Sequence, residues 1–168
     1  LPGYQPTPLV ALPDLAKEVG VKGVYIKDES KRFGLNAFKA LGASYAIHKL
    51  FPDGNVGLTV TATDGNHGKG MAWSTHRLGG HAVVFMPAGT VASRVEAIRA
   101  IGDTEVTVTD LNYDGTVATA AAYAKEHGGH LVQDTAFAGY EEVPENITLG
   151  YSTMAAEALE ELAALGVG

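Results

Sequence analysis

The sequence predicts an α/β fold in which an open, mainly parallel sheet carries helices on both faces, giving three layers. Three observations support this class. Short apolar runs alternate with helical runs, glycines mark the breaks between them, and the connections are short. Strands separated by helices in this way pair in parallel through right-handed crossovers.

The expected strands are short apolar runs with few charges that end close to glycine, proline or a polar turn residue. In chain order they are residues 24–26, 56–62, 82–86, 105–109 and 130–133. The expected helices are longer segments whose apolar residues fall near one face, such as Phe38, Leu41 and Tyr45 in the first. In chain order they are residues 37–50, 66–78, 91–101, 113–127 and about 148–165, the last after an irregular stretch through Pro144.

The composition argues against several classes of protein. Of the 168 residues, 46% are hydrophobic and 18% are charged, which is typical of one globular core and not of a disordered chain. The 12 basic and 19 acidic residues give a net charge of −7, and the basic residues do not cluster, so we expect no nucleic-acid partner. Apolar runs such as 82–86 are too short to cross a membrane, so we expect no membrane partner.

Cysteine is absent from the sequence, which leaves no disulfide or thiolate metal site and fits a reducing, cytoplasmic location. His127 and His130 flank two glycines without a third ligand nearby, so no metal site is predicted. The chain begins at Leu1 instead of methionine and ends in a helical run with no closing strand. We therefore expect a piece of a longer protein, or half of a split one.

The segment Thr61–Gly70 follows one expected strand and opens the next helix, and it contains three glycines among its ten residues. In a parallel sheet, ligands bind beyond the carboxyl ends of the strands, where helix N-termini offer free N–H groups. Two interpretations stay open: Asp64 caps the helix and the glycines allow close packing, or the loop binds an anionic ligand. The spacing matches neither a phosphate loop nor a dinucleotide fingerprint.

Lys39 is a lone cation beside Phe38 in the first turn of an otherwise apolar or small-residue helix. Burial and the positive end of the helix would both lower its pKa, as an amine that forms a Schiff base requires. The alternative is an ordinary solvent-facing lysine. Asp134 follows the last expected strand and either orders its loop or faces a ligand, whereas Arg94 is assigned to the solvated face of a helix.

Taken in order along the whole chain, several motifs resemble the 2,3-diaminopropionate ammonia-lyase family, within the tryptophan-synthase-β-like (fold type II) class of pyridoxal-phosphate enzymes. These motifs are Lys27-Asp28-Glu29-Ser30, Arg32 to Gly42, Thr63-Asp64-Gly65-Asn66-His67-Gly68, Met86-Pro87 and Gln133-Asp134-Thr135. Each motif is modest by itself, but their order and spacing make the resemblance specific.

The resemblance implies roles for individual residues. Lys39 would bind pyridoxal phosphate covalently, Phe38 would pack beside its ring and Asn66 would hydrogen-bond the ring oxygen. Other residues would face the substrate: Thr63, Asp64, Gly65, His67 and Asp134. Asp64, where related dehydratases carry a small or hydroxyl residue, would also be catalytic as a second proton-transfer group besides Lys39.

The resemblance further implies that residues 1–55 are a partial large-domain segment, 56–145 a small α/β domain and 146–168 a helix returning to the large domain. The family's phosphate-binding loop would come after residue 168. The expected activity is α,β-elimination from 2,3-diaminopropionate to pyruvate and ammonia, with a homodimer or a complementary C-terminal half as partner. The alternatives are a serine or threonine dehydratase and a catalytically inactive α/β fragment.

Overall fold

The structure is a computed structural model that describes residues 3–167, and these residues form two compact units. The first unit comprises residues 39–151 and contains a four-stranded sheet, and the second comprises residues 3–38 and 152–167. Helix α6 (Glu142–Ala164) contributes its beginning to the first unit and its remainder to the second. Within the described part of the chain, no helix combines the length and apolar character needed to cross a membrane.

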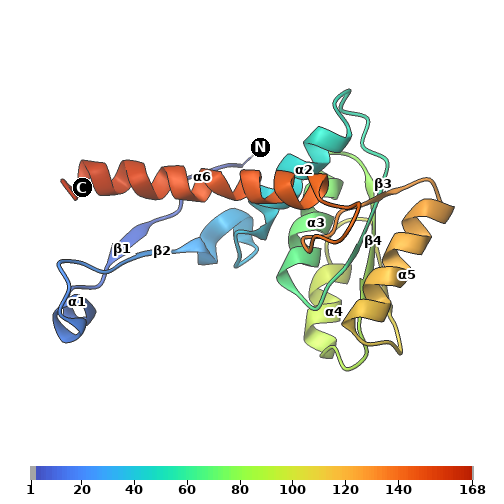
Figure 1. Cartoon of the computed structure of the whole chain (residues 1–168), viewed down its shortest axis with the longest axis horizontal. Coiled ribbons are helices and arrows are strands. Elements are labelled where there is room, and N and C mark those ends of the chain that lie inside the picture. The colour runs from blue at the N-terminus through green and yellow to red at the C-terminus, as the bar shows by residue number, and fades with distance from the viewer. Residues whose placement is uncertain (1–2, 168) are drawn as a thin grey trace. The chain divides into compact units, whose positions relative to one another are not determined.

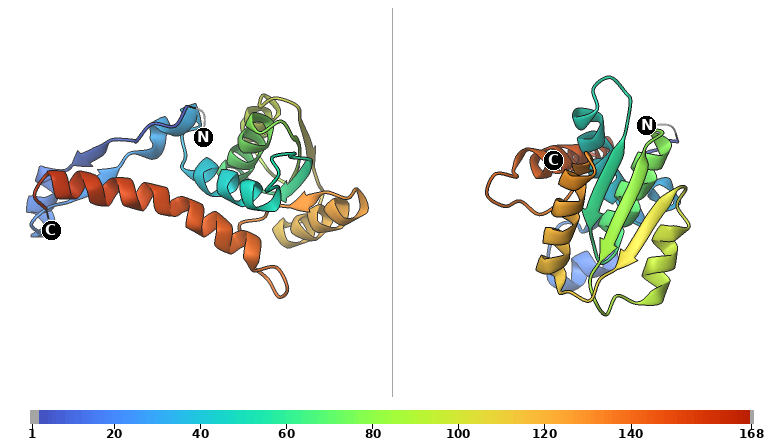
Figure 2. Two further views of the ribbon diagram at one scale, coloured as in Figure 1. Left: turned by 90° about the horizontal axis from the view of Figure 1, so that it is seen from above. Right: turned by 90° about the vertical axis from the view of Figure 1, so that its right-hand side faces the viewer.

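All strands of the four-stranded sheet are parallel, as expected, and their order across the sheet is β5-β4-β3-β6. The strands are β3 (Leu58–Ala62), β4 (His81–Met86), β5 (Thr104–Val108) and β6 (His130–Leu131). Val60 in the centre of β3 is level with Val83 of β4 on one side and Leu131 of β6 on the other. Figure 2 (right) shows the strands side by side.

Helices cover both faces of this sheet, which confirms the three-layer α/β class (Figure 1). On one face lie α3 (Asn66–Arg77) and α4 (Ala92–Arg99), and α2 (Lys39–Leu50) packs against α3. On the other face lies α5 (Tyr113–Glu126), whose small residues Ala120 and Ala124 pack against β3 and β4. Alternate β-branched side chains of the buried strands fill both layers.

The second unit contains elements that the sequence pattern did not predict. Strand β2 (Tyr25–Lys27) matches the expected strand at 24–26, but it pairs antiparallel with β1 (Leu9–Ala11) and lies outside the parallel sheet. Between them is α1 (Pro13–Val19), which has proline at its start and the left-handed Gly20 after its end. A short 3-10 helix, η1 (Glu29–Gly34), follows β2. All three missed elements are too short for periodicity to reveal them.

Two expected boundaries differ from the structure. The stretch before the last helix is not irregular through Pro144, because α6 begins at Glu142. Proline fits there since the first-turn N–H groups of a helix have no intrahelical partner. The compact units also change at residues 39 and 151, whereas the expected domains change at 56 and 146, because α2 packs with the sheet unit. The assignment of large and small domains stays a prediction.

Candidate active site

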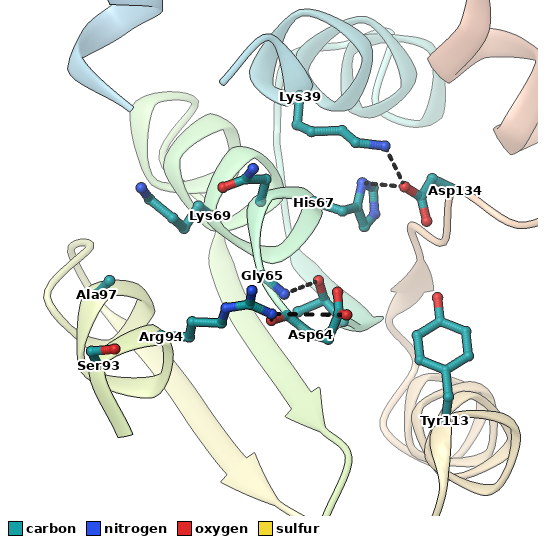
Figure 3. Close-up of a pocket in the computed structure, with 12 residues that line it drawn as sticks. Lys39, Asp64, Gly65, His67, Lys69, Ser93, Arg94, Ala97, Tyr113 and Asp134 are labelled. Carbon is teal, nitrogen blue, oxygen red and sulfur yellow. Dashed lines mark hydrogen bonds and ion pairs between the residues drawn. The ribbon is translucent and has the colours of Figure 1, made fainter. Parts of the chain in front are cut away.

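The strand order creates a crevice at one point of the sheet. From β3 the chain crosses through α3 to β4 and through α4 to β5, and then α5 returns it to β6 on the other side of β3. The carboxyl ends of β3 and β6 therefore flank the place where the direction of winding reverses, which is where open α/β sheets bind ligands. A cavity of about 460 Å³ lies there (Figure 3). Its lining residues are Lys39, Thr63, Asp64, Gly65, Asn66, His67, Lys69, Ser93, Arg94, Ala97, Tyr113 and Asp134.

Lys39 is the first residue of α2, and a glycine in the neighbouring helix α3 allows it to approach the cavity. A Cβ atom added to Gly70 would lie 2.7 Å from both the carbonyl carbon of Lys39 and the backbone nitrogen of Ala40. These are backbone atoms, which cannot rotate away. Any larger residue at position 70 would therefore push the start of α2 away from α3.

The Lys39 amine donates a hydrogen bond to Asp134, with Nζ 2.8 Å from Oδ2 (Figure 3). It also lies 5.5 Å from the centre of the Tyr151 ring. Burial lowers the pKa of Lys39, but the hydrogen bond and charge of Asp134 outweigh burial, and the pKa is raised. The expectation of a lowered pKa is therefore wrong for the chain without a ligand, because an acid from a distant segment pairs with the amine.

His67 is a buried neighbour of the same carboxylate. Its Nε2 lies 2.7 Å from the carbonyl oxygen of Val132, so Nε2 carries a proton and donates it. Burial lowers the pKa of His67, which favours the neutral ring. Its Nδ1 then holds a lone pair, lies 3.5 Å from Oδ2 of Asp134 and has no hydrogen-bond partner among the described residues. Burial raises the pKa of Asp134, but the hydrogen bond and positive charge of Lys39 act against burial and the pKa is lowered, so Asp134 is ionised.

The loop between β3 and α3 is ordered by Thr63. Its hydroxyl accepts hydrogen bonds from the backbone N–H groups of Gly65 (3.0 Å) and Gly68 (3.2 Å), and so caps the first turn of α3. Gly68 is needed for this contact, because an added Cβ would lie 2.3 Å from the Thr63 methyl group. The group that caps this helix is therefore the hydroxyl of Thr63 and not the carboxylate of Asp64, whose side chain lines the cavity and is 74% exposed.

Arg94 of α4 fixes Asp64 from the opposite side of the loop. Its Nη1 donates to the Asp64 carbonyl oxygen at 2.9 Å and lies 3.9 Å from the carboxylate oxygen Oδ2. Arg94 lies on an exposed face of its helix, as expected, but it also contacts the loop at Asp64 and lines the cavity. The sequence feature that could have placed Arg94 at the site was its position at the start of a helix that follows β4, because such positions face the carboxyl edge of the sheet.

The cavity brings together seven of the eight predicted site residues: Lys39, Thr63, Asp64, Gly65, Asn66, His67 and Asp134. Phe38 belongs to the other unit, so its place beside a cofactor stays a prediction. Sequence reasoning missed Arg94, Tyr113 and the contribution of Gly70. Among the described residues, no group of three histidine or acidic side chains is arranged to hold a metal ion.

The comparisons with known proteins agree with this geometry. The family model described as "Pyridoxal-phosphate dependent enzyme" matches residues 1–167. The chain is 47% identical to diaminopropionate ammonia-lyase of Escherichia coli K12 over 98% of its own residues and 46% of that protein. It is 26% identical to the L-threonine dehydratase of Lactococcus lactis, covering 96% of this chain and 37% of that protein.

Solved structures give the same result. The crystal structure of holo diaminopropionate ammonia-lyase from Escherichia coli superimposes with a TM-score of 0.94 at 46% identity, covering 100% of this chain and 48% of that one. A structure of the same enzyme with an aminoacrylate–pyridoxal-phosphate reaction intermediate gives a TM-score of 0.93. The chain spans about half the length of the curated relatives it matches. From its fold, its cavity and a match over nearly its whole length, the chain belongs to the family of pyridoxal-phosphate-dependent enzymes.

Proposed function

We propose that this chain forms part of an ammonia-lyase that converts 2,3-diaminopropionate and water into pyruvate and two molecules of ammonia. One observation carries the proposal. The amine of Lys39 and the carboxylates of Asp64 and Asp134 line a single cavity, in a chain 47% identical to a diaminopropionate ammonia-lyase. The substrate class is a small amino acid with a second amino group.

The lining residues fit pyridoxal phosphate. A volume of about 460 Å³ is in the usual range for cofactor pockets. Lys39 offers a primary amine for covalent attachment, and Asn66 offers an amide for the ring oxygen. The buried Nδ1 of His67 offers a spare acceptor at the same wall. When bound, pyridoxal phosphate withdraws electrons from the α-carbon of an amino acid and makes its proton removable.

Lys39 and Asp64 are the proposed bases for this proton. Figure 3 shows their side chains on different sides of the cavity. This supports the use of both enantiomers, because the α-protons of D and L substrates point in opposite directions. Asp134 stabilises the charged form of Lys39 across 2.8 Å, so the amine can keep a proton that it has taken up.

Asp64 separates this proposal from a serine or threonine dehydratase. A carboxylate at the cavity suits a substrate that carries a second, positively charged amino group, whereas a hydroxyl group offers no cation. Arg94 holds the backbone of Asp64, which supports a fixed position for the carboxylate. Thr63, Gly65 and His67 belong to the loop that is proposed to cradle the substrate carboxylate. Thr63 orders this loop, and the His67 ring does not itself donate to the carboxylate because its Nε2 proton goes to Val132.

The test is a comparison of substrates with the purified protein and added pyridoxal phosphate. We expect pyruvate and ammonia in a ratio of one to two from 2,3-diaminopropionate, at a higher kcat/KM than from serine or threonine. A preference for serine or threonine would support the dehydratase instead. Absence of product from all three would support the inactive fragment.

A cytoplasmic location and a homodimer, or an association with a complementary chain, complete the proposal. The cysteine-free sequence fits a reducing compartment. Light scattering of the purified protein should give twice the mass of its chain. A monomeric mass without a second polypeptide would contradict the proposed assembly.

A further inference from the structure

We propose that the buried side chain of Gln133 fixes the hydroxyl of Tyr113 as a hydrogen-bond donor to the carboxylate of the amino-acid substrate. Gln133 is a positioning residue in this account, and Tyr113 is the group that contacts the substrate. The inference rests on the proposed function only in requiring that the cavity bind an amino acid.

Gln133 lies at the crevice between β3 and β6 and is completely buried. The backbone ladder of the two strands ends just before it, where the N–H of Val132 donates to the carbonyl of Val60 at 2.8 Å. The side chain of Gln133 continues the hydrogen bonding between the two strands. Its Oε1 accepts from the N–H of Ala62 at 3.0 Å and from the hydroxyl of Thr61 at 3.1 Å.

These contacts fix which way the amide of Gln133 points. A backbone N–H can only donate, so the atom facing Ala62 must be the oxygen Oε1. The nitrogen Nε2 then faces Tyr113, with 2.9 Å between Nε2 and the phenolic oxygen. Because an amide nitrogen can only donate, the phenolic oxygen accepts this bond. The hydroxyl proton of Tyr113 is therefore left to donate to another group.

Tyr113 presents that proton to the cavity. It is the first residue of α5, follows the carboxyl end of β5 and lines the cavity. Figure 3 shows its ring rising from α5 with the hydroxyl pointing toward Asp134. Among the described residues the Tyr113 hydroxyl has no hydrogen-bond acceptor for this proton, and Asp134 accepts from Lys39. At neutral pH the amino groups of a free amino acid carry protons and cannot accept, so the substrate carboxylate is the acceptor that this donor fits.

Two variants test the direction of the hydrogen bond between Gln133 and Tyr113. Tyr113→Phe removes the hydroxyl. Gln133→Glu keeps the shape of the side chain and an oxygen for Ala62, but an ionised carboxylate can only accept, so Tyr113 would donate to it and not to the substrate. We expect each variant to raise KM about tenfold or more and to leave kcat within a few-fold, because a bond made equally to substrate and transition state is lost.

The double variant distinguishes positioning from simple loss of structure. If Gln133 acts through the hydroxyl of Tyr113, combining both changes should raise KM no further than Tyr113→Phe alone. Matched controls are Tyr123→Phe, which removes a hydroxyl from the same helix, and Gln5→Glu, which makes the same charge change at an exposed site. Additive effects of the two variants, or an unchanged KM for Tyr113→Phe, would overturn the inference.

A second measurement keeps the test independent of the substrate's identity and of the folding of Gln133→Glu. The side-chain amide resonance of Gln133 should shift in Tyr113→Phe and stay unchanged in Tyr123→Phe; no shift would overturn the inference.

The KM comparison is made with whichever of diaminopropionate, serine or threonine the protein turns over fastest. A preference for serine would thus refute the proposed function and leave this inference standing. If none is turned over, calorimetric affinity for 2,3-diaminopropionate replaces KM, and equal affinity of the wild type and Tyr113→Phe would overturn the inference.

Discussion

Replacing Glu157 by glutamine should destabilise the unit formed by residues 3–38 and 152–167, and the loss should depend on pH. Glu157 is buried and accepts from both terminal nitrogens of Arg32, at 2.9 and 2.8 Å. Burial raises the pKa of Glu157, but hydrogen bonds from Arg32, Tyr4 and Lys27 outweigh burial and lower the pKa from 4.5 to about 2. Arg32 is itself almost completely buried, so a neutral partner leaves its charge poorly compensated.

The difference in pKa sets the size of the effect. A carboxylate whose folded pKa is about 2 against 4.5 when unfolded contributes on the order of 3 kcal/mol at pH 7. Since the folded pKa is the lower one, this stability is present above pH 4.5 and is lost as the pH falls toward 2. Of that contribution, about 2 kcal/mol should already be lost at pH 3.

Urea unfolding followed by circular dichroism measures this. At pH 7 the free energy of unfolding of Glu157→Gln should lie about 3 kcal/mol below that of the wild type, and at pH 3 the difference should shrink to about 1 kcal/mol. The control is Glu160→Gln, which neutralises an exposed carboxylate on the same helix. A difference that stays constant between pH 7 and pH 3 would refute the reasoning.

Three further changes probe the site. Asp64→Asn should lower turnover of one enantiomer of diaminopropionate by about 10²–10⁴-fold more than turnover of the other, because a proton-transfer group is lost. The absorption spectrum of the bound cofactor should stay unchanged, because no contact with the cofactor is lost. Asp134→Asn removes the charge that raises the pKa of Lys39, so a larger fraction of the amine is neutral at pH 8. Cofactor binding, measured by absorbance, should therefore be faster and should depend less on pH. Gly70→Ala should lower the free energy of unfolding by about 1–3 kcal/mol and slow cofactor binding, because the new Cβ would meet the backbone of α2 at 2.7 Å.

Each of these three predictions has an outcome that would contradict it. An equal loss on both enantiomers would mean that Asp64 only binds the substrate. An unaltered pH profile in Asp134→Asn would mean that the ion pair does not control the amine. For Gly70, the matched change is Gly115→Ala on α5, where the added Cβ stays at least 3.1 Å from its neighbours. If both glycine variants were equally stable, the close approach of α2 to α3 would not need a glycine.

The parallel sheet could be predicted from the sequence because its signals are local. Glycines end the helices, β-branched runs mark the strands, and the rule that ligands bind at the carboxyl ends of strands led to the loop at Asp64 and to Asp134. The pattern around Lys39 left a Schiff-base amine and an ordinary lysine both open; the resemblance then favoured the first and added Asn66. These residues do line one cavity in the structure.

What could not be predicted depends on contacts between distant segments. Lys39 and Asp134 are 95 residues apart, so nothing near Lys39 in the sequence indicated that an acid would raise its pKa. The direction of the Gln133 amide is likewise decided by Ala62 and Tyr113, which no local pattern connects to it. The antiparallel pairing of β1 and β2 was missed because two strands of three residues carry almost no periodicity.

The measurement that tests the central claim most directly is the location of the covalent bond to the cofactor. The purified protein is incubated with pyridoxal phosphate, borohydride makes the bond between cofactor and lysine permanent, and peptide mass spectrometry finds the modified residue. We predict that the adduct is on Lys39, whose amine lies in the cavity beside Asp134. An adduct on Lys69, which lines the same cavity, or on Lys27 in the other unit, would contradict the account.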